Sequence, residues 1–203
     1  MLRHSRARAT AAVDYQRKLV RFLENHDEPR AAATFAPGQH KAAAIITYLS
    51  PGLRFLHQGQ FEGRRKRISP HLVRAPAEPA DAALRQFYER LLTALRQPTF
   101  RDGDWRLLDC VPAWDGNWTW DCFIAALWQG AERERRLIAV NYGANQSQCF
   151  VRLALPELSG RVLRLSDLMG SASFERDGSD LVARGLYLDM PPWGYHAFDL
   201  AAA

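Results

Sequence analysis

Residues 19–30, LVRFLENHDEPR, change from apolar to polar within a few positions. The first five residues favour a short strand, and the polar cluster Glu24–Glu28 comes directly after them. Pro29 then limits any continuation of regular structure. The stretch therefore predicts a strand that carries polar side chains at its carboxyl end.

The same order recurs further along the chain. Residues 40–49 (HKAAAIITYL) predict a helix, and residues 53–59 (LRFLHQG) predict a second short strand that again ends in polar side chains. Residues 81–96 have apolar positions three and four apart and predict the clearest helix, while residues 9–18 predict the end of a shorter one. This alternation is typical of parallel α/β architecture, in which sites gather at the carboxyl edge of the sheet. Two parallel strands do not bury both faces of a sheet, so we expect them to pack against further strands from outside these 203 residues.

The second half of the chain predicts an all-β domain. From Phe100 onward, short strands alternate with turn signals, including expected hairpin turns at Asp115–Asn117 and at Asp177–Gly178. About eight strands in roughly 100 residues are typical of an antiparallel sandwich. We therefore predict α/β plus all-β architecture, with one unit over residues 1–98 and a β-sandwich domain over residues 99–203.

Composition narrows the classes of function. The 203 residues are 47% apolar with a net charge of +5, and lysine plus arginine outnumber acidic residues by 17 to 8 in residues 1–98 but not beyond them. The basic residues are scattered rather than gathered with aromatics on one face, so we expect no nucleic-acid partner. No apolar run is long enough to span a membrane, and the start lacks the apolar core of a signal peptide. This favours the cytoplasm slightly, although location stays open. Cys110, Cys122 and Cys149 show no metal-ligand spacing, and we expect buried thiols.

Two motifs carry a resemblance to a known family. FLENHDEPR, residues 22–30, resembles the F-x-x-N-H-D motif at the seventh barrel strand of the α-amylase family of glycoside hydrolases. SPGLRFLHQGQFEG, residues 50–63, is similar to the eighth-strand segment of that family. A closing helix and a β-domain follow in the same order. The resemblance implies the last two strand–helix units of a (β/α)8 TIM barrel followed by the C-terminal β-sandwich domain.

The resemblance also implies roles for residues of the first motif. Asp27 matches the third catalytic carboxylate, which holds sugar hydroxyls at the cleaved residue, and His26 matches a sugar-binding histidine. Asn25 and Arg30 are expected to contribute to substrate binding, although Arg30 is equally suited to a structural salt bridge. Glu24 and Glu28 are left outside the site, with Glu24 as a support. The expected substrate is an α-glucan or maltooligosaccharide, without a cofactor or a metal ion in this part.

The second motif departs from the family pattern. His57 stands where an aromatic residue is usual, and Gln60 stands where an acid or an amide is common, so sugar contacts at this rim are left open. The basic run Arg64–Arg67 is interpreted as a solvated loop.

The chain lacks motifs for the other two catalytic carboxylates of the family. Retaining glycoside hydrolysis needs a nucleophile and a separate acid about 5 to 5.5 Å apart. In the family these lie on earlier barrel strands, so the expected partner is the N-terminal barrel portion of a parent enzyme, and residues 1–203 alone are predicted to be inactive. Linkage specificity, and the choice between hydrolysis and transglycosylation, stay open.

Two alternatives without catalysis are kept. Trp118 and Trp120 on one face of a strand, with Trp114 close by, are able to form a stacking platform for glucan, although tryptophan in a sandwich is more often packed in the core. The other alternative is a scaffold or regulatory protein derived from the enzyme, in which the motif persists without the other catalytic residues.

Overall fold

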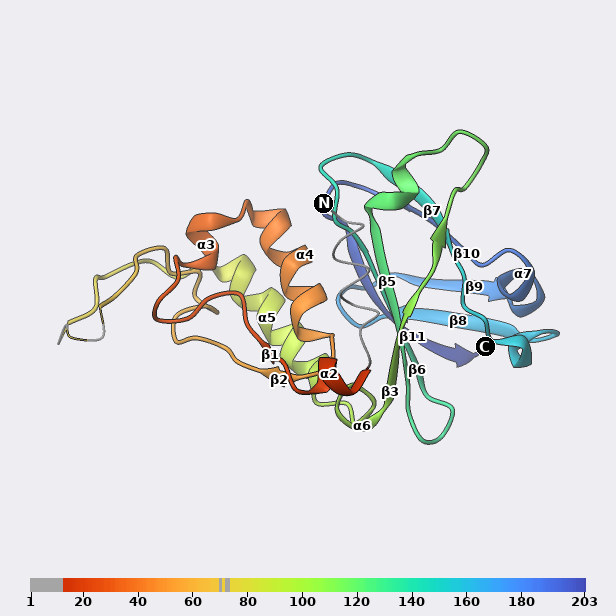
Figure 1. Cartoon of the computed structure of the whole chain (residues 1–203), viewed down its shortest axis with the longest axis horizontal. Helices are drawn as coiled ribbons and strands as arrows, with labels where there is room; N and C mark the ends of the chain where they lie inside the picture. Colours follow the sequence, from red (N-terminus) through yellow and green to blue (C-terminus); the bar gives the residue numbers. More distant parts are fainter. Residues whose placement is uncertain (1–12, 70, 72–73) are drawn as a thin grey trace.

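The computed structural model describes residues 13–69, 71 and 74–203. A helical part that includes two short strands lies against one side of a larger β-structure (Figure 1). The helix end expected at residues 9–18 is seen as α2 (Val13–Arg17), and residues 9–12 lie outside the described range. No helix in the described residues is both long and apolar enough to cross a bilayer.

The two short strands of the first half pair in parallel, as predicted. Strand β1 (Val20–Arg21) lies beside β2 (Leu53–Arg54), with Val20 opposite Leu53. The bond from Leu53 N–H to the Leu19 carbonyl is 2.9 Å long, and the bond from Phe55 N–H to the Arg21 carbonyl has the same length. These strands are shorter than expected, because in the described part of the chain each has the other as its one partner and no closed barrel is formed.

The helices follow local signals. Helix α4 (Pro37–Tyr48) starts earlier than predicted because Pro37 occupies the first turn, where a missing N–H is tolerated. Helix α5 (Ala82–Leu95) begins after Asp81, whose carboxylate accepts the Leu84 N–H at 2.9 Å. The short helices α3 (Ala31–Thr34) and α6 (Thr99–Asp102) were not anticipated.

The second half folds into two antiparallel sheets. Their orders in the described chain are β3-β5-β6-β11-β8-β9 and β10-β7-β4. The strands are β3 (Asp104–Leu108), β4 (Cys110–Val111), β5 (Phe123–Gln129), β6 (Arg135–Asn141), β7 (Ser147–Val151), β8 (Val162–Asp167), β9 (Ser173–Asp177), β10 (Leu186–Met190) and β11 (Tyr195–Ala202). Three short helices connect them, η1 (Thr119–Cys122), η2 (Pro156–Leu158) and α7 (Gly178–Ala183).

Strands β5 and β6 of the six-stranded sheet are buried on both faces, whereas its edge strand β9 is exposed. One face packs against the three-stranded sheet around Phe123, Leu127 and Leu137. Cys110 and Cys149 are buried in this core as expected, whereas Cys122 is only partly buried. The other face packs against α4 and α5, which explains why β5 and β6 read as nearly continuous apolar runs (Figure 1). The helical part and the sandwich therefore share a core.

Both expected hairpin turns are wrong. Strands β3 and β5 do pair, but between them the chain crosses to the other sheet, where β4 pairs with β7, so Asp115–Asn117 lies in a crossover loop. Asp177 ends β9 and caps α7 instead of turning a hairpin, because its carboxylate accepts the Asp180 N–H at 3.0 Å.

Candidate functional site

The predicted site residues lie in a loop that leaves the carboxyl end of β1. The side-chain oxygen of Asn25 accepts the backbone N–H groups of Asp27 at 2.8 Å and Glu28 at 2.9 Å, which folds the loop into a tight turn. His26 and Asp27 project from this turn with side chains 64% and 73% exposed, and His26 Nε2 lies 3.2 Å from Asp27 Oδ2. The structure thus brings the imidazole and the carboxylate together on an open surface.

A buried ion pair closes the base of this loop. Arg30 Nη1 lies 2.6 Å from Glu24 Oε1, and both side chains are 1% exposed. The second oxygen of Glu24 accepts the Ala31 N–H at 2.7 Å. Because Glu24 precedes the turn and Arg30 follows it, the pair holds both ends of the loop. We call Glu24 and Arg30 the loop clamp.

The loop clamp also joins the ends of the two parallel strands. Arg30 Nη2 donates to the Gln58 carbonyl at 2.9 Å, and Arg30 Nη1 lies 2.6 Å from His57 Nδ1. Gly59 has a φ of +88°, and a Cβ there would lie 2.5 Å from Arg30 Nη2, so this position favours glycine. Of the two roles considered for Arg30, these contacts are those of the salt bridge. Its burial corrects the expectation that it faces a sugar.

Behind the second strand lies a neutral hydrogen-bond network. Gln60 is 1% exposed, and its amide donates to the hydroxyls of Tyr48 and Tyr88 at 2.8 Å each. His40 Nε2 lies 2.9 Å from the Tyr88 hydroxyl. Burial lowers the pKa of His40 to about 4 and raises the pKa of Tyr48 to about 12. Gln60 is therefore a packing residue that supports the strand end from inside.

The basic run Arg64–Arg67 is tied down beside the loop. The backbone N–H of Arg65 donates to Glu78 at 2.9 Å, and this hydrogen bond lowers the pKa of the Glu78 carboxyl. Arg67 Nε donates to the His26 carbonyl at 3.3 Å. The segment is a surface loop, as expected, and it contacts the backbone of the motif.

One face of the parallel pair is apolar and open. Val20, Phe22, Leu53 and Phe55 alternate along the two strands and are between 40% and 66% exposed. The rings of Phe22 and Phe55 lie 6.3 Å apart, edge to face. Large apolar side chains gathered on one sheet face mark a surface that packs against something else.

The expected tryptophan platform on a strand is wrong. Asn117 accepts the N–H groups of Thr119 at 2.9 Å and Trp120 at 3.2 Å, which winds this segment into η1 rather than a strand. Trp118, just before η1, is 83% exposed, whereas Trp120 packs against the sandwich core. The two rings therefore form no common face.

The described residues contain no candidate metal site. Among residues 13–69, 71 and 74–203, no cluster of three or more His, Cys, Asp or Glu side chains is arranged to hold a metal ion.

The comparisons with known proteins place the fold. No protein-family model matches the sequence, and no curated protein matches it. The noncanonic maltogenic α-amylase AmyB from Thermotoga neapolitana matches 93% of this chain and 45% of its own, with a TM-score of 0.71 and 14% identity. The α-amylase from Geobacillus thermoleovorans, in complex with acarbose, matches 93% and 42% at a TM-score of 0.70 and 19% identity. An Anoxybacillus α-amylase matches 99% of this chain and 42% of its own, with a TM-score of 0.68 and 18% identity.

The chain has the fold of the C-terminal portion of α-amylase-type glycoside hydrolases. It spans less than half the length of the structures named above. The resemblance expected from the two motifs is confirmed at the level of the fold.

Sequence reasoning missed two groups of residues. The contact of Arg30 with His57 and Gln58 joins segments 27 and 28 residues apart, and no local pattern signals it. A hollow on the small sheet, lined by Phe150 and Tyr187, was also missed. Its signal is the alternation of both strands, which places one aromatic ring on the outer face of each.

Proposed function

We propose that this chain is the C-terminal part of an α-glucan-acting glycoside hydrolase or transglycosylase of the α-amylase type. In this proposal Asp27 and His26 contact the sugar at the cleaved bond. The observation that carries it is the exposed His26–Asp27 pair at the carboxyl end of a parallel strand. This is the edge at which α/β enzymes place their sites.

The proposed chemistry follows from the two side chains. An ionised Asp27 accepts hydrogen bonds from two sugar hydroxyls, and such charge-assisted bonds strengthen as positive charge develops on the ring. His26 donates to a further hydroxyl. Asp27 therefore stabilises the transition state, and it does not itself perform the displacement.

Asn25, Glu24 and Arg30 are proposed to act through the loop rather than by touching the sugar. The Asn25 oxygen is already engaged by two backbone N–H groups, and the loop clamp is buried. Asn25 holds the turn through these two hydrogen bonds, and the loop clamp holds the two ends of the loop together. A transition-state contact is effective only when its geometry is held in advance.

The open apolar face supports the missing-partner part of the proposal. A parallel sheet is normally covered on both faces. Phe22 and Phe55 are 41% and 40% exposed, and in the described chain β1 and β2 pair only with each other. We propose that earlier barrel strands of an N-terminal portion cover this face and supply the nucleophile and the general acid.

Two neighbouring structures support a carbohydrate substrate. The Geobacillus α-amylase was solved in complex with acarbose, and a Nostoc punctiforme debranching enzyme, with a TM-score of 0.64 to this chain, was soaked with it. These statements hold for those proteins. For this chain an α-glucan is the substrate class that agrees with them.

The test joins this chain to a barrel. The first six strand–helix units of the Geobacillus α-amylase are fused ahead of Val13, and release of sugar from maltoheptaose is measured. The fusion should be active, while residues 1–203 alone should show no turnover. In the fusion, Asp27→Asn should lower kcat by about 100-fold to 1000-fold. Glu28→Gln, one position away and also exposed, is the matched control and should change kcat less than about twofold.

Two results would contradict the proposal. One is a fusion whose activity survives Asp27→Asn. The other is turnover by residues 1–203 alone that Asp27→Asn abolishes, because this chain would then contain its own nucleophile.

A further inference from the structure

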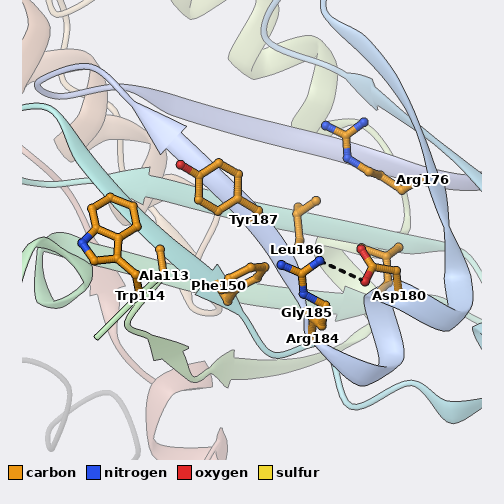
Figure 2. A pocket seen from close by; sticks show the side chains of 10 residues that line it. Ala113, Trp114, Phe150, Arg176, Asp180, Arg184, Gly185, Leu186 and Tyr187 are labelled. Carbon is orange, nitrogen blue, oxygen red and sulfur yellow. Dashed lines mark ion pairs between the residues drawn. The ribbon is translucent and has the colours of Figure 1, made fainter. Parts of the chain in front are cut away.

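Three aromatic side chains surround a hollow on the outer face of the three-stranded sheet (Figure 2). Tyr187 of β10 is paired with Phe150 of β7, and their rings lie 5.5 Å apart. Trp114, from the loop after β4, lies at the end of the hollow opposite Arg176 and Asp180 (Figure 2). The hollow measures about 440 Å³, which is within the usual range of small-molecule sites.

The rings face outward because the strands alternate. The neighbours of Tyr187, Leu186 and Leu188, are buried in the sandwich core, so Tyr187 lies on the opposite face. Tyr187 is 45% exposed and Trp114 is 52% exposed, even though both belong to residue types that gain most from burial. An open aromatic surface in a hollow is a feature of binding sites rather than of solvated sheet faces.

The rim of the hollow is polar, with Arg176, Arg184 and Asp180 as its charged side chains. Arg184 lies 5.1 Å above the Phe150 ring and pairs with Asp180 at 3.5 Å (Figure 2). Arg176 lies 5.2 Å from the ring of Phe174. Arg184 is therefore paired with a carboxylate, whereas the Arg176 guanidinium contacts a ring outside the hollow and the Glu175 carbonyl. The hollow presents rings beside hydrogen-bond donors and acceptors.

We propose that this hollow is a second carbohydrate site, which holds a short stretch of α-glucan away from the Asp27 loop. A pyranose has an apolar face and a rim of hydroxyls, which match the aromatic floor and the Asp180–Arg184 edge. Tyr187 and Trp114 contact the face of the sugar, and Asp180 and Arg184 bind its hydroxyls. A purely apolar ligand would displace water from the exposed Asp180–Arg184 pair without offering it a hydrogen bond. The choice of α-glucan rests on the proposed function.

Binding at this place needs no chemical step. The hollow lies in the sandwich, whereas Asp27 lies in the helical part, so the two surfaces are separate on the chain. A second contact with a polymer raises the local concentration of further chain segments near the first site. We infer that the hollow retains the polymer.

The experiment measures binding by residues 1–203 alone. Retardation in native gels containing amylopectin and calorimetric titration with maltoheptaose give the affinity. Tyr187→Ala and Trp114→Ala should each weaken binding about tenfold, which corresponds to the loss of one ring contact. Tyr187→Phe retains the ring and should stay within about twofold.

A matched control separates the hollow from its surroundings. Trp118→Ala removes a more exposed tryptophan that does not line the hollow, so it should leave the affinity unchanged. Circular dichroism confirms that each variant is folded.

The proposal is overturned if no α-glucan is bound, if Trp118→Ala weakens binding as much as Trp114→Ala, or if cellohexaose is bound in place of maltoheptaose. If the hollow binds no α-glucan but the fusion is active and depends on Asp27, the second site is refuted and the proposed function stands. If the hollow binds α-glucan but the fusion stays active after Asp27→Asn, the proposed function is refuted and the second site is retained.

Discussion

Removal of the Glu24 carboxylate is the sharpest test of the loop clamp. The Glu24→Ala change leaves the guanidinium of Arg30 buried without its ionic partner and the Ala31 N–H without its acceptor. Both clamp side chains are 1% exposed, so water does not compensate. Breaking one side of a buried pair costs about 3–5 kcal/mol. We therefore expect the free energy of unfolding to fall by that amount.

The double variant Glu24→Leu/Arg30→Met distinguishes a buried charge from lost packing. It removes both charges while keeping apolar volume, and it leaves Ala31 N–H and the Gln58 carbonyl unpaired. We expect a cost of about 1–3 kcal/mol, less than the cost of Glu24→Ala alone.

Urea unfolding followed by tryptophan fluorescence measures these free energies. Arg164→Ala is the control, because its ion pair with Glu175 at 3.3 Å is about half exposed on both sides and should contribute less than about 1 kcal/mol. A loss below about 1 kcal/mol for Glu24→Ala, or a double variant less stable than the single one, would refute the loop clamp.

Two further predictions concern the site and its support. The pKa of His40 falls to about 4 in the folded chain, so protonation favours the unfolded state as the pH drops from 6.5 towards 4. Urea titrations should lose about 2 kcal/mol between pH 7 and pH 5, and His40→Leu should remove most of this dependence; an unchanged pH profile contradicts the assignment. Asn25→Ala should cost about 1 kcal/mol and speed hydrogen exchange at the Asp27 and Glu28 amides, whereas Asn25→Asp, which keeps the acceptor, should not.

Local patterns were sufficient for much of the fold. The strand at β1, the helices α4 and α5 and the alternation in β7 and β10 each follow from side-chain periodicity and caps within one segment. The parallel pairing of β1 with β2 was also predicted, because a helix separates the two strands. Both expected hairpin turns were wrong. At Asp115–Asn117 the chain is returning from β4, which pairs with the distant strand β7. Asp177–Gly178 is equally suited to a helix cap, and its carboxylate accepts the Asp180 N–H.

The sequence by itself determined the composition of the candidate site: an Asn-His-Asp triplet at the end of a short strand, in a pattern that resembles the α-amylase family. Only the tertiary structure decided the roles around it. Arg30 is buried by contacts with Glu24, His57 and Gln58, and Phe150 and Tyr187 meet across two strands that are far apart in the chain. Such contacts depend on which distant segments pack together, and the physical chemistry of one segment does not contain that information.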